Sequence, residues 1–305
     1  MTELILNLRA SWRDYYEMCK PRVVFLMVLT SVVGMFLAVP GMVPISTLVL
    51  GNLGIALVAA AGAVCNHLID RNIDLKMKRT HNRPLPQGRV GPKQTIIFAS
   101  AIGLSGMSIL LLWINPLCAW LTLASFVGYA FIYTGYLKHA TPQNIVIGGL
   151  AGAMPPLLGW SAVTGTIDPG AVILVIIIFA WTPPHFWALA IHRKDEYEKS
   201  GVPMLPVTHG EQVTKLHIIF YTGFLIVVSS MPYFIGMSGS FYLAVAMLLG
   251  AGFQFFSWML LMKPGPRTAM NTFRYSIVYL ALLFVALLMD HYLCLLYTSP
   301  SPRDS

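Results

Sequence analysis

The chain has 305 residues, of which 56% are hydrophobic and only 10% are charged, with a formal net charge of +8. This composition excludes an ordinary soluble domain, in which about a quarter of the residues carry a charge. The positive balance requires no nucleic acid partner, because the topology of a membrane protein and contact with anionic membrane lipid account for it.

Nine apolar stretches are expected to cross the membrane, since each approaches the roughly 20 residues that a helix needs to span a bilayer. They cover residues 22–40, 48–69, 95–114, 117–136, 145–163, 170–191, 216–236, 240–262 and 272–295. The stretches are too long and too uniformly apolar for the alternating strands of a barrel. We therefore expect an all-α polytopic membrane protein with a single domain over residues 1–295, and a disordered or non-native tail over residues 296–305.

The basic residues predict the orientation of this bundle. All Lys and Arg residues except Arg303 lie in the N-terminal segment or in the connections after the second, fourth, sixth and eighth stretches. By the positive-inside rule, the N-terminus and these connections face the cytoplasm. The first residues resemble neither a cleavable signal nor a transit peptide. We expect a multi-pass protein of the cell inner membrane.

The second stretch ends in three oxygen-bearing side chains, Asn66, Asp70 and Asp74, at intervals of four residues. At about 100° per residue, this spacing keeps them on one narrow stripe of a helix. Two carboxylates one turn apart repel each other unless a cation lies between them, and Mg²⁺ prefers such oxygen ligands. The pattern predicts a magnesium site. The alternative is that the carboxylates pair with neighbouring basic residues where the helix leaves the bilayer.

A basic loop follows these carboxylates directly, and it contains Arg79, Asn82 and Arg83. A guanidinium group binds two phosphate oxygens at once, which a carboxylate cannot do. A metal ion and arginines around a diphosphate stabilise it as a leaving group. We therefore expect diphosphate binding by this loop, with Asp70, Asp74, Arg79 and Arg83 as catalytic residues.

The sixth stretch contains Pro183 and Pro184, followed at once by His185. Proline interrupts the i→i−4 hydrogen bonds, which is tolerated in a membrane where the helix bends around a cavity. An ionisable residue at this depth is a candidate functional residue. The alternative for His185 is a neutral imidazole that is hydrogen-bonded to a neighbouring helix.

A second acidic segment, Asp195–Glu198, follows this stretch on the cytoplasmic side. It repeats the order of the first site, because an apolar helix again runs into carboxylates beside basic residues and prolines. Two such helix ends facing each other across a cavity would hold two metal ions and one diphosphate. Asp195 is the expected metal ligand here, and a solvated surface turn is the alternative.

With both acidic segments in view, residues 15–290 resemble the UbiA superfamily of intramembrane prenyltransferases. The segment from Asn66 to Pro84 carries the superfamily pattern. Two further motifs, Thr141-Pro-Gln-Asn and Trp181-x-x-Pro-His185, point to the branch that farnesylates protohaem IX. The segment Gly201-x-Pro-Met-Leu-Pro206 completes the resemblance.

The resemblance implies nine transmembrane helices around a central cavity with a cap on the cytoplasmic side. It implies Mg²⁺-dependent transfer of farnesyl from farnesyl diphosphate to a vinyl group of haem B, giving haem O, so that haem B is a substrate and not a prosthetic group. Association with haem A synthase or with the assembly of a terminal oxidase is a further expectation.

The resemblance also assigns site residues. The family's metal ligands correspond to Asn66, Asp70 and Asp74, and its diphosphate-contacting basic residues to Arg79, Arg83 and Lys138. His185 becomes the candidate for the haem side. The second acidic segment departs from the family pattern, because Arg193 and Tyr197 occupy positions where acids are expected, which leaves Asp195 as its acidic anchor.

Two other functions remain open at this point. The same diphosphate site would serve a prenyltransferase with another lipophilic or aromatic acceptor, of the quinone or chlorophyll type. A polytopic transporter would use Asp70 and Asp74 along an ion pathway. A transporter, however, more naturally places acids near the middle of the membrane, whereas these acids lie at the end of a span beside basic loops.

Overall fold

The computed structural model describes residues 10–75 and 80–298, and every regular element in these two ranges is a helix. The longer helices are α3 (Pro21–Leu37), α4 (Ile45–Ile69), α6 (Pro92–Ile109), α7 (Pro116–Val127), α9 (Asn144–Ala153), α10 (Pro155–Thr164), α11 (Pro169–His192), α14 (Gly210–Phe234), α15 (Ser240–Met262) and α16 (Pro266–Thr298). Two π-helical segments, η1 (Leu110–Ile114) and η2 (Gly128–Leu137), continue α6 and α7. The short helices are α2 (Trp12–Met18), α5 (Arg71–Asp74), α8 (Lys138–Ala140), α12 (Lys194–Ser200) and α13 (Leu205–Thr208).

The nine expected spans agree with this helix order. Within the described ranges, eight helical segments are long and apolar enough to cross a membrane, and the bent pair α2 and α3 makes a ninth if it counts as one span. The seventh and ninth spans begin at Gly210 and Pro266, earlier than the expected residues 216 and 272. Their first turns are polar, so hydropathy alone places the helix starts too late. The chain is thus an all-helical, multi-pass membrane protein.

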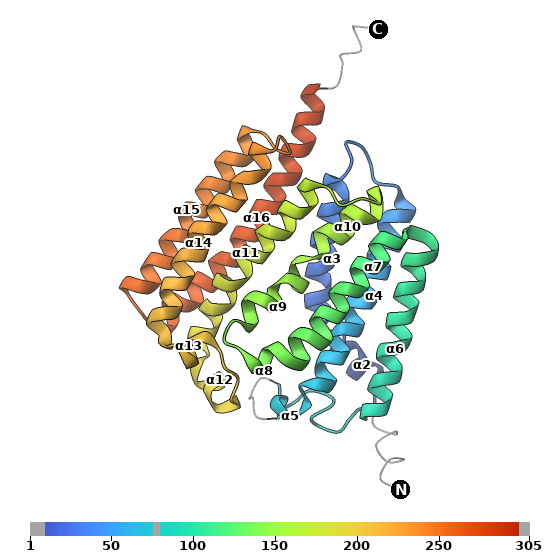
Figure 1. The fold of residues 1–305 in the computed structure, drawn as a ribbon, viewed down its shortest axis with the longest axis vertical. Helices are drawn as coiled ribbons and strands as arrows, with labels where there is room; N and C mark the ends of the chain where they lie inside the picture. The colour runs from blue at the N-terminus through green and yellow to red at the C-terminus, as the bar shows by residue number, and fades with distance from the viewer. Residues whose placement is uncertain (1–9, 76–79, 299–305) are drawn as a thin grey trace.

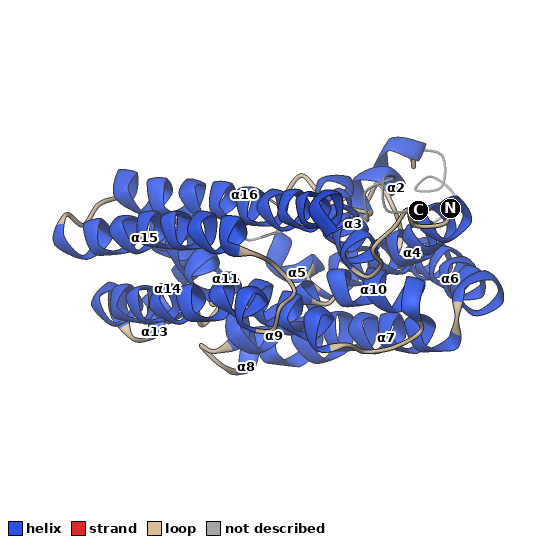
Figure 2. Ribbon diagram, turned by 90° about the horizontal axis from the view of Figure 1, so that it is seen from above, coloured by secondary structure: helices blue, strands red, loops and turns tan. Residues whose placement is uncertain are grey.

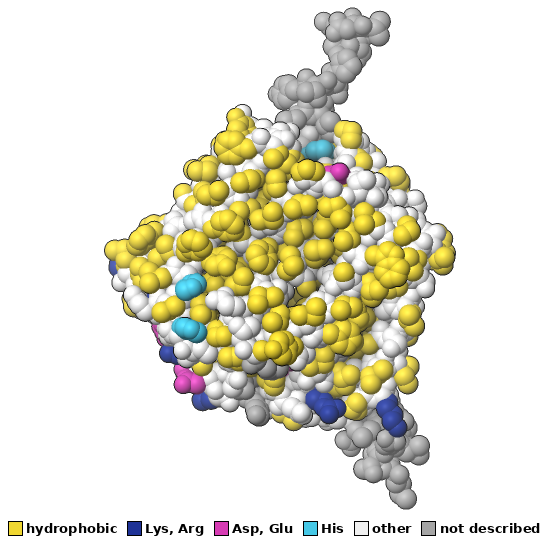
Figure 3. Space-filling model, viewed as in Figure 1, with side chains coloured by type: hydrophobic (Ala, Val, Ile, Leu, Met, Phe, Trp, Pro, Cys, Tyr) yellow, Lys and Arg dark blue, Asp and Glu magenta, His cyan; other side chains and the backbone are white. Residues whose placement is uncertain are grey.

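The surface agrees with burial in lipid. Hydrophobic side chains are spread over most of the face in Figure 3, and most of the Lys and Arg side chains visible there lie toward its lower end. Large apolar residues on this exterior are strongly exposed, among them Leu248 at 74% and Phe220 at 68%. A soluble protein rarely exposes an apolar surface of this extent, whereas the hydrocarbon core of a bilayer solvates it.

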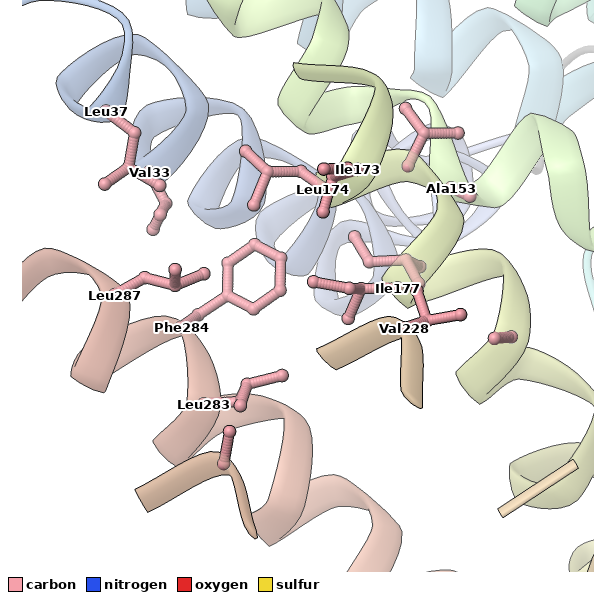
Figure 4. Close-up of a cluster of buried hydrophobic side chains, with 14 of the residues drawn as sticks. Val33, Leu37, Ala153, Ile173, Leu174, Ile177, Val228, Leu283, Phe284 and Leu287 are labelled. Atoms are coloured by element: carbon pink, nitrogen blue, oxygen red, sulfur yellow. The ribbon is translucent and has the colours of Figure 1, made fainter. Parts of the chain in front are cut away.

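The core lies around α11, which packs against α9, α14 and α16. Figure 4 shows side chains of α11 meeting those of α3, α14 and α16 in one apolar cluster. The labelled members include Val33, Ile173, Leu174, Ile177, Val228, Phe284 and Leu287. Lipid tails are as apolar as these side chains, so the cluster stabilises the bundle by close packing more than by removal from water.

Two glycines let α3 and α10 touch backbone to backbone. A Cβ atom on Gly34 would overlap the carbonyl oxygen of Pro156, and one on Gly159 would overlap the carbonyl oxygen of Ser31. Small residues at helix crossings are typical of membrane proteins, because they permit the close approach that drives association in lipid. This contact holds α3 against the bundle, and it therefore also fixes the position of Lys20, the residue directly before α3.

The short helices α5, α8, α12 and α13 gather at one end of the molecule, shown at the bottom of Figure 1. In Figure 2, α15, α16 and α3 lie along one side of the bundle and α9 and α7 along the other, with α11 and α10 between them. We call the end with the short helices the capped end. The expected central cavity stays a prediction. Leu296–Thr298 of the expected tail continue α16, and the rest of that tail lies outside the described residues.

Candidate active site at the capped end

The three oxygen-bearing residues of the second span lie together, and we call Asn66, Asp70 and Asp74 the acidic stripe. Helix α4 ends at Ile69, but the amides of Asp70 and Asp74 still bond the carbonyls four residues earlier, each at 2.9 Å. The helical path therefore continues into α5 and keeps the stripe on one side. All three residues are buried, and Asn66 Nδ2 donates to Asp70 Oδ2 at 2.7 Å.

The basic loop folds back onto the lower end of this stripe. Arg83 Nη1 lies 2.9 Å and 2.7 Å from the two carboxylate oxygens of Asp74. Thr80 Oγ1 donates to the backbone carbonyl of Asp74 at 3.1 Å, which fixes where the loop turns. The Asp74 side chain is only 4% exposed and the Arg83 side chain 17%. A partly desolvated pair of this kind interacts more strongly than one at an aqueous surface.

The π-helical segment η2 delivers a second cation. Thr134 Oγ1 donates to the carbonyl of Tyr129 at 2.9 Å, five residues back, and accepts a hydrogen bond from Asn66 Nδ2 at 3.3 Å. Segments of π-helix are rare and are frequently found at functional sites. Just beyond η2, Lys138 Nζ lies 2.6 Å from Asp70 Oδ2. This contact brings Lys138 to the acidic stripe, as the resemblance implied.

A third cation, Lys20, was missed by the sequence analysis, which counted it only as a topological charge. Lys20 separates α2 from α3, which meet at a bend of 51°, and it has left-handed backbone angles of φ 49° and ψ 58°. That conformation costs a residue with a Cβ atom about 1–2 kcal/mol. It directs the ammonium group inward, where Nζ donates to Asn66 Oδ1. A signal was available in the Lys20–Pro21 dipeptide at the start of the first span.

We call Lys20, Arg83 and Lys138 the cation triad. When Lys20 is protonated, their charges exceed by one those of the two carboxylates that they contact or approach. This local excess suits an anionic ligand. At the same time, Asp70 Oδ1 is buried and has no hydrogen-bond partner, so one carboxylate oxygen remains available to a metal ion.

The oxygen donors of the acidic stripe fit Mg²⁺. In the described ranges, no three His, Cys, Asp or Glu side chains converge on one point. The stripe therefore offers two carboxylates and one amide oxygen, and not a complete cage. Mg²⁺ is usually held in this way, by one or two carboxylates together with water and substrate phosphate.

Of the other two residues of the predicted diphosphate site, only one lies within the described residues. Arg79 lies outside the described residues. The side chain of Asn82 is exposed, and its backbone carbonyl accepts a hydrogen bond from Arg89 Nη2 at 2.6 Å. Arg89 also pairs with the buried Asp14 of α2 at 2.5 Å, so that it anchors the loop to the N-terminal helix.

Among the described residues, Asp195 of the second acidic segment does not join Asp70 and Asp74 in a group that could hold one metal ion. Asp195 is exposed on α12. Its neighbour Glu196 is half-buried, and its Oε2 atom is enclosed without a hydrogen-bond partner. The sequence analysis favoured Asp195, but the pattern could not show which of these carboxylates faces inward, because the direction of α12 does not follow from it. The burial of an unpaired carboxylate oxygen makes Glu196 a second candidate.

His185 lies in α11, about two turns before its end at the capped side, and is 8% exposed. Its Nδ1 atom lies 2.6 Å from Ser276 Oγ of α16. The imidazole is stacked between Trp181, at 4.1 Å, and Phe273, at 4.5 Å between ring centroids. The hydrogen bond to a neighbouring helix that the sequence analysis kept as an alternative is therefore present, but it uses one ring nitrogen only.

Comparison with known proteins identifies relatives over almost the whole chain. The profile of the UbiA prenyltransferase family matches residues 27–287. A protoheme IX farnesyltransferase of Saccharophagus degradans is 61% identical over 93% of this chain and 94% of its own length. Protoheme IX farnesyltransferase 1 of Pseudomonas putida (strain GB-1) is 60% identical over 97% and 99%.

Solved structures with the same fold are more distant in sequence. A digeranylgeranylglyceryl phosphate synthase superposes with a TM-score of 0.79 at 20% identity, covering 92% of this chain and 98% of its own. A UbiA homologue from Archaeoglobus fulgidus, bound to DMAPP and Mg²⁺, gives a TM-score of 0.65 at 15% identity, covering 90% and 99%. At these identities the likeness supports the fold alone.

Proposed function

Because this chain belongs to the UbiA prenyltransferase family, we propose that it transfers farnesyl from farnesyl diphosphate to a vinyl group of haem B, giving haem O. Relatives named protoheme IX farnesyltransferase support this substrate pair, since they match at 60–61% identity over nearly their full length. One structural observation carries the chemical part of the proposal. The acidic stripe and the cation triad meet at the end of an apolar bundle, where a lipid chain and a charged headgroup are both accommodated.

The proposed roles of these side chains follow from their charges. Mg²⁺ held by the acidic stripe would neutralise the charge that develops on the diphosphate as its bond to the allylic carbon breaks. The cation triad already stands at the stripe, so its members need only short movements to exchange carboxylate oxygens for phosphate oxygens. Arg79, which lies outside the described residues, is proposed for the same role on sequence grounds.

The proposed transfer step needs water as its only additional reagent. The carbon–oxygen bond of farnesyl diphosphate breaks, and its electron pair leaves with the diphosphate. The vinyl π electrons form the new carbon–carbon bond, and the resulting cation beside the porphyrin takes hydroxide from water, which releases a proton. The apolar bundle around α11 keeps water from the allylic cation before the bond forms. His185 is the proposed contact on the haem side.

Asp195 stays proposed as an anchor of a second metal ion. Its exposed carboxylate would act through a metal-bound water, and Glu196 is the alternative anchor because one of its oxygens is buried without a partner. We also propose that the protein lies in the cell inner membrane with the capped end toward the cytoplasm, because the basic loops lie there. Association with haem A synthase or terminal oxidase assembly is proposed only from the expected product.

An acceptor assay tests the proposed function. The purified protein in lipid nanodiscs is given farnesyl diphosphate and Mg²⁺, with either haem B or 4-hydroxybenzoate as the acceptor. Mass spectrometry should find a farnesylated, hydrated porphyrin and no prenylated aromatic acid. Prenylation of the aromatic acid with haem left unchanged would establish a different acceptor and contradict the proposal, while leaving the diphosphate site intact.

A further inference from the structure

Residues from one turn of α11 and one turn of α16 form a network of hydrogen bonds and stacked rings around His185. Ser276 is fully buried and takes part through both its backbone and its side chain. Its carbonyl accepts a hydrogen bond from Trp181 Nε1 at 2.7 Å, and its hydroxyl lies 2.6 Å from His185 Nδ1. The same hydroxyl lies 2.6 Å from the carbonyl oxygen of Phe273. Trp181 and Phe273 are the two residues whose rings stack on the imidazole.

Counting protons in this network determines which tautomer His185 adopts. The Ser276 hydroxyl has one proton, and the Phe273 carbonyl can only accept a hydrogen bond. Because two oxygen atoms 2.6 Å apart repel each other without a proton between them, the hydroxyl proton points to Phe273. The hydroxyl oxygen then accepts a hydrogen bond from His185, whose Nδ1 carries the proton. In a neutral imidazole the other nitrogen, Nε2, then has a free lone pair. Among the described residues, none forms a hydrogen bond with this nitrogen.

The network also fixes the direction of that lone pair. The rings of Trp181 and Phe273 lie against opposite faces of the imidazole, at 21° and 28° from its plane. A partial turn of the ring would break the stack, and a half-turn about the Cβ–Cγ bond, which keeps the stack, would break the hydrogen bond between Nδ1 and Ser276. His185 is 8% exposed, and Phe186 packs against it edge-on, at 5.1 Å between the ring centroids.

We infer that Ser276 is a positioning residue that holds His185 in the Nδ1–H tautomer, so that Nε2 is an axial ligand for the iron of the haem acceptor. The inference rests on the proposed function. It distinguishes between two roles for His185, because a nitrogen without a proton cannot donate a hydrogen bond to a haem propionate but is a good ligand for iron. Histidine ligands of metals commonly donate their second N–H to an oxygen atom that fixes the ring, and Ser276 supplies that oxygen.

The first test measures the tautomer without haem. Solid-state NMR of ¹⁵N-histidine-labelled protein in nanodiscs, compared with His185→Gln, identifies the two signals of His185. The wild type should show a protonated Nδ1 and an unprotonated Nε2. Ser276→Ala should give a mixture of tautomers, whereas Ser276→Thr, which keeps the hydroxyl, should retain the wild-type pattern. A protonated Nε2 in the wild type, or an unchanged pattern in Ser276→Ala, would overturn the role of Ser276.

The second test measures ligation of the iron by titration with haem B. Ser276→Ala should shift the Soret band and weaken haem binding by about 10-fold, while Mg²⁺-dependent binding of farnesyl diphosphate stays unchanged. Ser257→Ala is the matched control, because among the described residues the hydroxyl of this buried serine bonds a carbonyl of its own helix alone. An unchanged Soret band in both Ser276→Ala and His185→Gln would overturn iron ligation by His185. If the wild type binds no haem, iron ligation and the proposed acceptor both fail, while the NMR result still decides the tautomer.

Discussion

Lys138 donates to Asp70 Oδ2 at 2.6 Å, which joins the end of η2 to the end of α4 across the capped end of the bundle. The Asp70 side chain is only 3% exposed. Burial of a carboxylate without a cation is strongly disfavoured, so the contact with Lys138 offsets the cost of burying Asp70. The same carboxylate has a second oxygen without a partner, which prepares it to bind a metal ion when the ammonium turns to a phosphate.

Replacing Arg83 by Lys should impair transfer although the charge is kept. A point ammonium cannot reproduce the contact of the guanidinium with both oxygens of Asp74, or its fork toward phosphate. Loss of a charged hydrogen bond costs about 1.5–3 kcal/mol, which corresponds to roughly 10–100-fold in kcat/KM for farnesyl diphosphate. Arg71→Lys is the matched control, because this neighbouring side chain is exposed. Equal losses in the two variants would mean that the loop acts only as a basic patch.

Lys20→Met should raise the KM for farnesyl diphosphate and leave the KM for haem unchanged. The ammonium of Lys20 reaches the stripe through Asn66 Oδ1, so its removal takes positive charge from the diphosphate side only. Arg22→Met is the control, because the Arg22 side chain is exposed and lies two residues away in the sequence. This variant should behave as the wild type. Steady-state kinetics with each substrate varied in turn make the comparison. An unchanged KM for farnesyl diphosphate in Lys20→Met would remove Lys20 from the site.

The second acidic segment is tested by two single variants, Asp195→Asn and Glu196→Gln. If Asp195 anchors a second metal ion, its variant should need more Mg²⁺ for half-maximal activity than the wild type does. The measurement is activity against free Mg²⁺ at saturating substrates. A raised requirement in Glu196→Gln alone would transfer the role to the residue with the buried oxygen. Unchanged curves for both variants would leave the acidic stripe as the complete metal site.

Gly159→Ala should lower the melting temperature of the protein. A Cβ atom there would overlap the backbone of Ser31, so α3 and α10 must separate at a cost of roughly 1–3 kcal/mol. Gly152→Ala is the matched control, because a Cβ atom at that position meets no other atom within 4 Å. Thermal unfolding in detergent, followed by loss of the monodisperse peak on size exclusion, compares the two. A stable Gly159→Ala variant would contradict the close contact of α3 with α10.

The spans could be predicted from the sequence because the bilayer allows few solutions, and hydropathy reports burial in lipid directly. The acidic stripe was also predictable, since Asn66, Asp70 and Asp74 lie on one helix and helical geometry brings them together. Lys20 was not, because its contact with Asn66 depends on how a bend between α2 and α3 packs against a distant helix.

Two other features of the site could not be predicted from the sequence, because they too depend on how separate helices pack. Whether Asp195 or Glu196 faces inward depends on the angle at which α12 leaves α11, for which no local pattern exists. The partnership of Ser276 with His185 joins α16 to α11, and a single buried serine carries no signal in a sequence. Contacts within one helix follow from spacing, whereas contacts between helices require the packed bundle.

Pigment analysis tests the central claim most directly. Cells that lack haem O are made to express either the wild-type chain or Asp70→Asn, which keeps the shape of the side chain but not its charge. Haems extracted from their membranes are separated and identified by mass. The wild type should produce haem O, and Asp70→Asn, at equal protein level in the membrane, should produce none or a trace, because removing one such charge interaction costs a step about 10²–10³-fold in rate. Absence of haem O from the wild-type membranes, or an equal yield from Asp70→Asn, would contradict the account.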